Sequence, residues 1–321
     1  MANATTALET DLEHLPADTR VGEYLIEQLI GVGGFARVYR AHHPVLGTRV
    51  AVKVITRALA LDPEAIQRFV LEAQAASRIT HPGVVRILDY GKLLDGRAYQ
   101  VMELIEGPAL DHHLDRVGRV PLDQALRLLA EIAAALDAAH DAGIVHRDLK
   151  PANVLLAPAA DGPSARLADF GIAKALETEG ATPQLTRTGT TLGTPAYMSP
   201  EQALGRAVGK PSDVYAFGVV AFELITGRVP FAGETPFETM MMHVQTPAPM
   251  PSAVCVELGP RFDAAMGSLL AKHPEQRPTT LAAAMAMLRE ELVASAPVAA
   301  SSHRRPRVVA AGLAVLALAA V

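Results

Sequence analysis

The segment HRDLKPAN, at residues 146–153, carries a carboxylate, a cation and an amide at fixed offsets. These groups belong to Asp148, Lys150 and Asn153. A positioned carboxylate can receive the proton of a hydroxyl group, and a cation beside it can brace a γ-phosphate. Asp169, which opens an Asp-Phe-Gly run, adds a second oxygen ligand that suits a magnesium ion. The residue types and their spacing therefore indicate phosphoryl-transfer chemistry.

A glycine-rich stretch upstream, GVGGFARV at residues 31–38, is suited to binding phosphate groups. Glycines let backbone N–H groups approach phosphate oxygens without a Cβ in the way. A dinucleotide-binding fold competes for this pattern, but it expects an acidic residue about 20 positions further on. A predicted strand bearing Lys53 stands there instead. A Walker A loop is excluded as well, because Gly205–Lys210 has the wrong spacing and Pro211 replaces the required Ser or Thr.

In this order and at this distance, these motifs resemble the glycine-rich, catalytic and metal-binding loops of eukaryotic-like protein kinases. The Asp-Leu-Lys-Pro run resembles the Ser/Thr subgroup. The resemblance covers about residues 22–293, and the chain is similar to the bacterial transmembrane Ser/Thr protein kinases. It implies an α+β, two-lobed fold. The N-lobe (21–104) would hold a five-stranded antiparallel sheet and one helix, and the larger C-lobe (105–293) would be mainly helical.

The resemblance assigns a role to each catalytic side chain. Asp148 would be the base that orients the substrate hydroxyl and takes its proton late. Lys150 would contact the γ-phosphate. Lys53 would pair with the α- and β-phosphates and with Glu72, a carboxylate that needs a partner because it lies on an apolar helix stripe.

The resemblance also implies the cofactors, which are ATP and Mg²⁺, with Mn²⁺ as a substitute. Asn153 and Asp169 would hold the metal ion. Val38 and Ala51 would form the roof over adenine, and Met102 occupies the gatekeeper position. The predicted ATP site consists of Ile30, Gly31, Val32, Gly33, Gly34, Phe35, Ala36, Val38, Ala51, Lys53, Met102, Glu103 and Ile105.

Residues outside the cleft extend the resemblance. Glu201, in a Ser-Pro-Glu run, would pair with Arg277. Asp213 would bond to the backbone of the catalytic loop. Arg147 directly precedes the proposed base, and it would form a buried cationic pocket that needs an anion.

A threonine-rich segment at residues 172–198 is the predicted activation loop. Thr186 and Thr188 match the positions that are phosphorylated in the bacterial group. Thr194 matches the family threonine that contacts Asp148 and Lys150. Loop composition alone is the alternative explanation for these threonines.

Hydrophobic periodicity places the elements that must position these residues. Short apolar runs across residues 21–57 predict three strands, and residues 84–90 and 98–103 predict two more. Asp62-Pro63 reads as an N-cap followed by the first residue of a helix whose apolar stripe includes Glu72. Further helices are predicted at Leu122–Ala142, Ser212–Thr226 and Leu281–Leu292.

Composition narrows the class of protein. The chain has 321 residues, a hydrophobic share of 50% and a formal net charge of −5, with both signs interspersed. Without a basic stripe, nucleic acid is not expected as a partner. Cys255 is the only cysteine, which excludes an internal disulfide. Residues 1–20 are polar, lack the apolar region of a signal peptide, and are predicted to be a disordered leader.

The other end of the chain has a different composition. Residues 294–307 read as a juxtamembrane linker with a basic cluster at Arg304, Arg305 and Arg307. Residues 308–321 are entirely apolar or Gly. As a helix they would span about 21 Å, against roughly 30 Å for the hydrocarbon core of a bilayer. We expect them to begin a transmembrane helix, and a C-terminal helix packed on the domain is the alternative.

These observations together predict an ATP-dependent protein serine/threonine kinase that autophosphorylation of its activation loop switches on. It would be a single-pass protein of the cell membrane, with the kinase domain in the cytoplasm. Its expected partners are protein substrates with Ser or Thr, the membrane, and a second kinase domain in a dimer. A kinase-like scaffold that transfers nothing is the alternative, although the residues it would have lost are all present.

Overall fold

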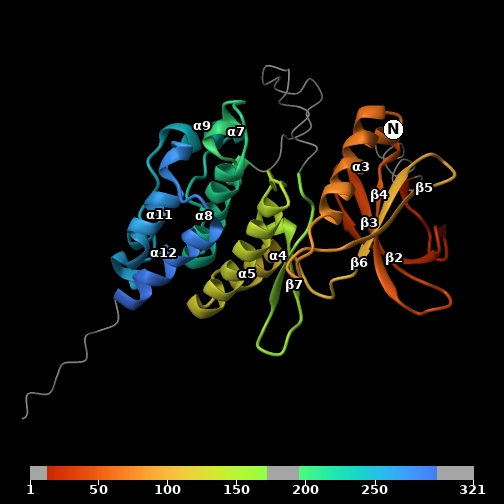
Figure 1. The fold of residues 1–321 in the computed structure, drawn as a ribbon, viewed down its shortest axis with the longest axis horizontal. Coiled ribbons are helices and arrows are strands. Elements are labelled where there is room, and N and C mark those ends of the chain that lie inside the picture. The colour runs from red at the N-terminus through yellow and green to blue at the C-terminus, as the bar shows by residue number, and fades with distance from the viewer. Residues whose placement is uncertain (1–12, 172–194, 295–321) are drawn as a thin grey trace, which may run out of the picture.

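The apolar runs between residues 20 and 103 fold into an antiparallel sheet of six strands, in the spatial order β1-β2-β3-β4-β6-β5 (Figure 1). The computed structural model describes residues 13–171 and 195–294. The strands are β1 (Arg20–Val21), β2 (Tyr24–Val32), β3 (Ala36–His42), β4 (Arg49–Ile55), β5 (Ile87–Lys92) and β6 (Ala98–Glu103). The sequence predicted five strands, because β1 has two residues and shows no periodicity of its own.

Successive side chains along β4 and β6 point to opposite faces of the sheet, and the two faces pack against different groups of residues. One face packs an apolar cluster that includes Val52, Tyr99 and Val101. On the opposite face, Ile55 and Ala98 pack against the helix of this lobe. Lys53 lies on this second face, because it alternates with Val52 along β4.

Helix α3 (Pro63–Ser77) is the helix predicted for this lobe, and its start follows from the sequence. The side chain of Asp62 accepts a hydrogen bond from Glu64 N at 2.9 Å, and Pro63 opens the first turn. Phe69 is buried against Ile55 and Ala98 of the sheet. A short helix, α2 (Arg57–Ala60), precedes α3 and was not predicted.

The prediction of a disordered leader over residues 1–20 is wrong for residues 13–20. Leu15 is only 7% exposed and belongs to the apolar cluster on the outer face of the sheet. Its backbone N–H donates to the hydroxyl of Tyr39 at 3.1 Å. Glu13 reaches the start of α2, where its carboxylate accepts a hydrogen bond from Arg57 N at 2.9 Å. One buried leucine and this cap explain why a polar segment is ordered here.

The second lobe is helical and is built around α8 (Lys210–Thr226) (Figure 1). Every residue of α8 from Ser212 to Thr226 is buried except Glu223. The helix ends at Gly227, whose φ of 78° is the left-handed conformation that glycine adopts most readily. The other helices are α4 (Leu110–Val117), α5 (Leu122–Asp141), α7 (Pro200–Ala203), α9 (Pro236–Gln245), α10 (Pro251–Val254), α11 (Asp263–Leu269) and α12 (Leu281–Ala294).

A hairpin of β7 (Val154–Ala157) and β8 (Ser164–Leu167) connects the two lobes at the cleft. The backbone N–H of Val85 donates to Leu167 O at 2.8 Å, and Leu167 N donates to Gly83 O at 2.7 Å. Ala168 N donates to Asn153 O at 2.9 Å. These bonds hold the residues before Asp169 against both the catalytic loop and the segment that follows α3.

Within residues 13–171 and 195–294, none of the helices is both long enough and apolar enough to cross a bilayer. The predicted linker and the apolar segment 308–321 lie outside the described residues, apart from Ala294 at the end of α12.

Candidate active site

Asp148, Lys150 and Asn153 converge in the loop that follows α5. The Nζ of Lys150 lies 3.0 Å from Oδ2 of Asp148. The side-chain amide of Asn153 donates to the backbone oxygen of Asp148 at 2.8 Å and to its Oδ2 at 3.3 Å. The side chains of Asp148 and Lys150 are each 20% exposed. The loop therefore presents a carboxylate that is held by a cation and an amide and that a substrate can still reach.

Asp213 holds the backbone of this loop from the start of α8. Its Oδ2 accepts the N–H of His146 and its Oδ1 accepts the N–H of Arg147, both at 2.8 Å. Its Oδ2 also lies 2.7 Å from Nε2 of His140, and both side chains are buried. Arg147 has a φ of 64°, a conformation that costs a non-glycine residue free energy. The hydrogen bonds from the N–H groups of His146 and Arg147 to Asp213 stabilise that conformation and hold the backbone that leads into Asp148.

Lys53 meets Asp169 across the cleft. The Nζ of Lys53 lies 2.7 Å from Oδ1 of Asp169. Burial lowers the pKa of Lys53, but the carboxylates of Asp169, Glu72 and Asp148 outweigh it and raise that pKa above its ordinary value. The sequence predicted a direct pair between Lys53 and Glu72. In the structure, the side chain that hydrogen-bonds to Lys53 is Asp169. The charge of Glu72 helps to raise the pKa of Lys53.

The Asp-Phe-Gly run lies directly on the catalytic loop. Gly171 N donates to His146 O at 2.8 Å, and a Cβ at position 171 would lie 2.8 Å from the Cβ of Asp148. Only glycine fits this approach without a shift of Asp148. Phe170 is buried, and its ring lies 4.6 Å from that of His146.

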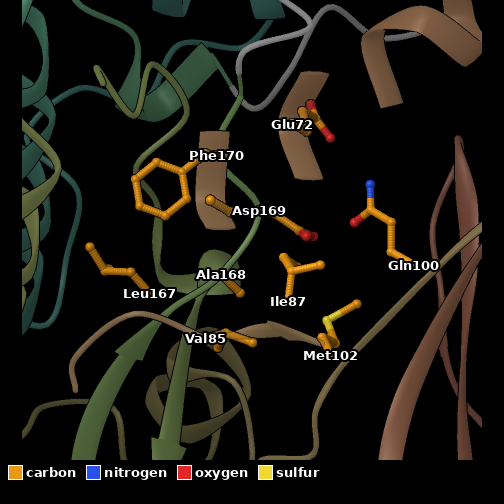
Figure 2. A pocket seen from close by; sticks show the side chains of 10 residues that line it. Glu72, Val85, Ile87, Gln100, Met102, Leu167, Ala168, Asp169 and Phe170 are labelled. Carbon is orange, nitrogen blue, oxygen red and sulfur yellow. The ribbon is translucent and has the colours of Figure 1, made fainter. Parts of the chain in front are cut away.

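A small cavity of about 20 Å³ lies between the sheet, α3 and the Asp-Phe-Gly run, with Met102 in its lining. Figure 2 shows the polar ends of Glu72, Asp169 and Gln100 around one space, with apolar side chains beside them. The cavity is lined by Glu72, Ala76, Val85, Ile87, Gln100, Met102, Leu167, Ala168, Asp169 and Phe170. Gln100 is a polar lining residue that the motifs did not identify.

The residues predicted to cover adenine form part of one apolar cluster. Val38, Ala51 and Met102 come from the sheet, whereas Leu155 and Ala168 come from the second lobe. The last two were not predicted. Leu155 lies on β7 just after the catalytic loop, and the continuous apolar run Val-Leu-Leu-Ala could have indicated this strand but not which of its side chains faces the cluster.

The glycine-rich turn joins β2 and β3. Gly33 N donates to Ala36 O at 2.9 Å and closes the turn. The apolar side chains of Ile30, Val32 and Phe35 are exposed. The turn therefore presents an exposed apolar surface, where the sequence predicted the nucleotide to bind.

The oxygen donors of the site fit a magnesium ion. The side chain of Asp169 is 47% exposed, and the amide nitrogen of Asn153 is engaged by Asp148, which leaves the Asn153 oxygen for a metal. The described residues contain no group of three or more His, Cys, Asp or Glu side chains that could hold a metal ion. Since Mg²⁺ is often bound by one or two carboxylates together with substrate phosphates, the site fits a metal that arrives with a nucleotide.

Glu201 and Arg277 form a buried, bidentate ion pair. The two guanidinium nitrogens lie 2.7 Å and 2.9 Å from the two carboxylate oxygens. Ser212 Oγ also donates to Glu201 at 2.7 Å. Burial raises the pKa of Glu201, but the hydrogen bonds from Arg277 and Ser212 outweigh it and lower the pKa. The structure brings together the pair that the sequence predicted.

A buried histidine on α9 was not predicted. Nδ1 of His243 lies 2.9 Å from the hydroxyl of Tyr215, and its backbone oxygen accepts a hydrogen bond from Lys272 at 2.7 Å. Burial and the charge of Lys272 lower the pKa of His243 to about 4. Helix α9 packs against the turn Pro195–Tyr197, so this cluster supports the last part of the predicted activation loop. A single histidine in a helix offers no motif by which to find it.

The predicted activation-loop residues Thr186, Thr188 and Thr194 lie in residues 172–194, outside the described residues. Arg147, the predicted anion partner, is half-buried rather than buried. Its carbonyl accepts a hydrogen bond from Gln202 at 2.7 Å.

Comparison with known proteins agrees with this geometry. A family model described as the protein kinase domain matches residues 24–292. The chain belongs to this family. The serine/threonine-protein kinase PknA of Mycobacterium tuberculosis is 41% identical over 264 residues, which cover 81% of this chain and 59% of PknA. The serine/threonine-protein kinase pkn3 of Myxococcus xanthus is 36% identical over 282 residues, which cover 87% of this chain and 52% of that protein.

A solved structure supports the same fold. The kinase domain of Mycobacterium tuberculosis PknI, crystallised as a double mutant, has a TM-score of 0.69 and 27% sequence identity. The match covers 87% of this chain and 99% of the PknI chain. The two-lobed kinase fold predicted from the motifs is confirmed. The chain spans less than two thirds of the length of PknA and pkn3.

Proposed function

We propose that this protein is an ATP-dependent protein serine/threonine kinase. The main support for the proposal is that side chains from the helical lobe and from the sheet lie together at one cleft. Asp148, Lys150 and Asn153 come from the helical lobe, and Asp169 is hydrogen-bonded to Lys53 of the sheet. The two bacterial kinases above, which are more than a third identical to this chain, support the serine/threonine specificity.

Asp148 orients the substrate hydroxyl and receives its proton. The hydroxyl oxygen bonds to the γ-phosphorus while the bond from that phosphorus to the bridging oxygen of ADP breaks. Lys150, 3.0 Å from Asp148, neutralises charge on the transferred group. Most of the rate enhancement comes from positioning and charge neutralisation, because the transition state for phosphoryl transfer is loose.

The nucleotide lies between the lobes. Lys53 contacts the α- and β-phosphates, and the glycine-rich turn supplies backbone N–H groups to them. Backbone groups of Glu103 and Ile105 bind the adenine edge, and the apolar cluster around Met102 packs against its faces. Asn153 and Asp169 would hold Mg²⁺, or Mn²⁺ in its place, and the metal ion would neutralise charge on the phosphates.

The proposal is tested with radiolabelled ATP, Mg²⁺ and a generic protein substrate. Acid hydrolysis of the labelled product should yield phosphoserine and phosphothreonine. Nucleotide binding without any transfer would instead identify a kinase-like scaffold. Label only in phosphotyrosine would contradict the serine/threonine specificity.

Phosphorylation of Thr186 or Thr188 switches the enzyme on. The support is electrostatic, because Arg147 directly precedes the base, forms no ion pair with any residue of 13–171 or 195–294, and would find an anion in a phosphothreonine. Mass spectrometry before and after incubation with ATP locates the modified residues. Full activity in a Thr186→Ala/Thr188→Ala double variant would rule the switch out.

The segment 308–321 tethers the chain to the cell membrane, with the kinase domain in the cytoplasm. Arg304, Arg305 and Arg307 lie on its N-terminal side, and positively charged flanks remain cytoplasmic. The full chain should sediment with membranes, and a chain ending at Val293 should be soluble and active. Recovery of the full chain in the soluble fraction without detergent would contradict the tether.

A further inference from the structure

Gln100 is a buried polar residue that the proposed reaction does not use. It lies in the middle of β6 and is 4% exposed. Its neighbours on the same face of that strand, Ala98 and Met102, belong to two separate apolar clusters. An amide buried among apolar side chains is unfavourable unless it is hydrogen-bonded. A hydrophobic residue would be the simpler choice at this position if packing were its only task.

The register of the sheet places Gln100 beside the proposed phosphate-binding lysine. Gln100 pairs directly with Lys53 in the antiparallel ladder of β4 and β6. Residues that pair in this way point their side chains to the same face of the sheet. The two polar residues therefore form one row across the sheet, between the cluster that contains Ile55 and the cluster that contains Ala51.

The amide of Gln100 is bonded to helix α3. Its Nε2 donates to the backbone oxygen of Phe69 at 2.6 Å, and both residues are buried. Glu72 lies three residues after Phe69, and residues three apart are neighbours on one side of a helix. The hydrogen bond therefore fixes the turn of α3 that carries Glu72. Figure 2 shows the amide of Gln100 and the carboxylates of Glu72 and Asp169 around the same small space.

We propose that Gln100 is a positioning residue, whose hydrogen bond to Phe69 ties α3 to the sheet and aims Glu72 at Lys53. This role rests on the proposed kinase function. Lys53 is bonded to Asp169 in the structure, and Asp169 is the proposed metal ligand. If Asp169 serves as the metal ligand, as proposed, Lys53 would need another carboxylate to hold it against the phosphates. Gln100 keeps Glu72 within reach for that exchange.

The test compares Gln100→Met with the wild-type protein. Methionine keeps the length and removes the donor, so the kcat for phosphate transfer should fall about three- to tenfold, the equivalent of one ordinary hydrogen bond. The KM for the protein substrate should not change, because the substrate hydroxyl meets the helical lobe. The melting temperature should stay the same or rise, since a buried amide is replaced by an apolar group.

Gln28→Met is the matched control, because it makes the same change at an exposed position of the same sheet. It should leave kcat unchanged. A fall in kcat that is accompanied by a lower melting temperature would make Gln100 a structural residue only and would overturn the role. If Gln100→Met is not recovered folded, Gln100→Leu is measured under the same criteria.

A double-mutant cycle shows whether Gln100 acts through Glu72. In a Glu72→Gln background, Gln100→Met should have little further effect on kcat. An equal fall in both backgrounds would overturn the proposal. Failure of the wild-type protein to transfer phosphate would instead reject the kinase function, whereas an active wild type with an equally active Gln100→Met variant would reject only the role of Gln100.

Discussion

Asp148 and Asp169 are carboxylates in one cleft, but their neighbours give them different tasks. Asp148 is held by Lys150 and Asn153 of its own loop. Asp169 comes from the segment after β8 and reaches Lys53 on the opposite lobe. Under the proposed function, the first carboxylate would meet the substrate hydroxyl, and the second would meet a metal ion and the phosphates.

Neutralising Asp169 and neutralising Asp148 should therefore have different effects on nucleotide binding. Asp169→Asn should weaken the Mg²⁺-dependent binding of ATP, because a neutral amide is a poorer metal ligand than a carboxylate. Asp148→Asn should bind ATP nearly as the wild type does. Titration with ATP, with and without Mg²⁺, measures both variants. Equal loss of affinity in the two variants would contradict the division of roles.

Residues of the site could be predicted from the sequence where they belong to a short motif. Asp148, Asn153 and Asp169 follow from short runs with fixed spacing. Gln100 could not be predicted, because its role depends on a strand register and on a helix backbone that is distant in sequence. The hydrogen bond of Lys53 to Asp169 was not predicted for a related reason. Several carboxylates lie near one lysine, and spacing alone does not rank their distances.

Among the elements, long helices with apolar periodicity or a long apolar run were predictable, and short helices were not. Helices α3, α5, α8 and α12 were located from their apolar periodicity and their flanking Asp, Pro or Gly residues. Helices α7 and α10 have four residues each, too few to display a period. The ordered part of the leader was missed because a single leucine anchors it.

The anchoring of the leader predicts a stability effect. Leu15→Ala should destabilise the domain by about 2–3 kcal/mol, because it removes a buried side chain from the outer cluster of the sheet. Leu94→Ala, at a fully exposed position, should have almost no effect and is the control. Chemical denaturation of the two variants measures the difference. Equal stabilities would show that residues 13–20 do not contribute to the fold.

The ion pair of Glu201 and Arg277 links α7 to the segment before α12, and it should behave as a buried pair. Glu201→Gln or Arg277→Met alone should cost about 3–5 kcal/mol, because each leaves a buried charge without its partner. The double variant should lose less than the sum of the two single losses. Additive losses would indicate that the charges stabilise the lobe independently of each other.

The stability of the domain should depend on pH through His243. Its pKa is lowered to about 4 in the folded protein, so the unfolded chain binds the additional proton between about pH 6.5 and pH 4. Stability should therefore fall as pH decreases through this window, by on the order of 3 kcal/mol from this residue. Burial lowers the pKa of His146 too, and this histidine acts in the same direction.

Thermal unfolding across this pH range tests the dependence on His243. The stability of a His243→Gln variant should fall less as the pH decreases. The fall that remains should be the part that arises from His146. The same decrease in both proteins would show that His243 is not the group responsible.

The central claim is that the cleft between the two lobes catalyses phosphate transfer. Its most direct test is the single-turnover rate of γ-phosphate transfer to a protein hydroxyl, measured for the wild type and for Asp148→Asn with ATP and Mg²⁺ saturating. We predict transfer by the wild type and a rate lower by about a hundred- to ten-thousand-fold in the variant, with melting temperature retained. Near-equal rates, or no transfer by a wild-type protein that binds ATP, would contradict the account.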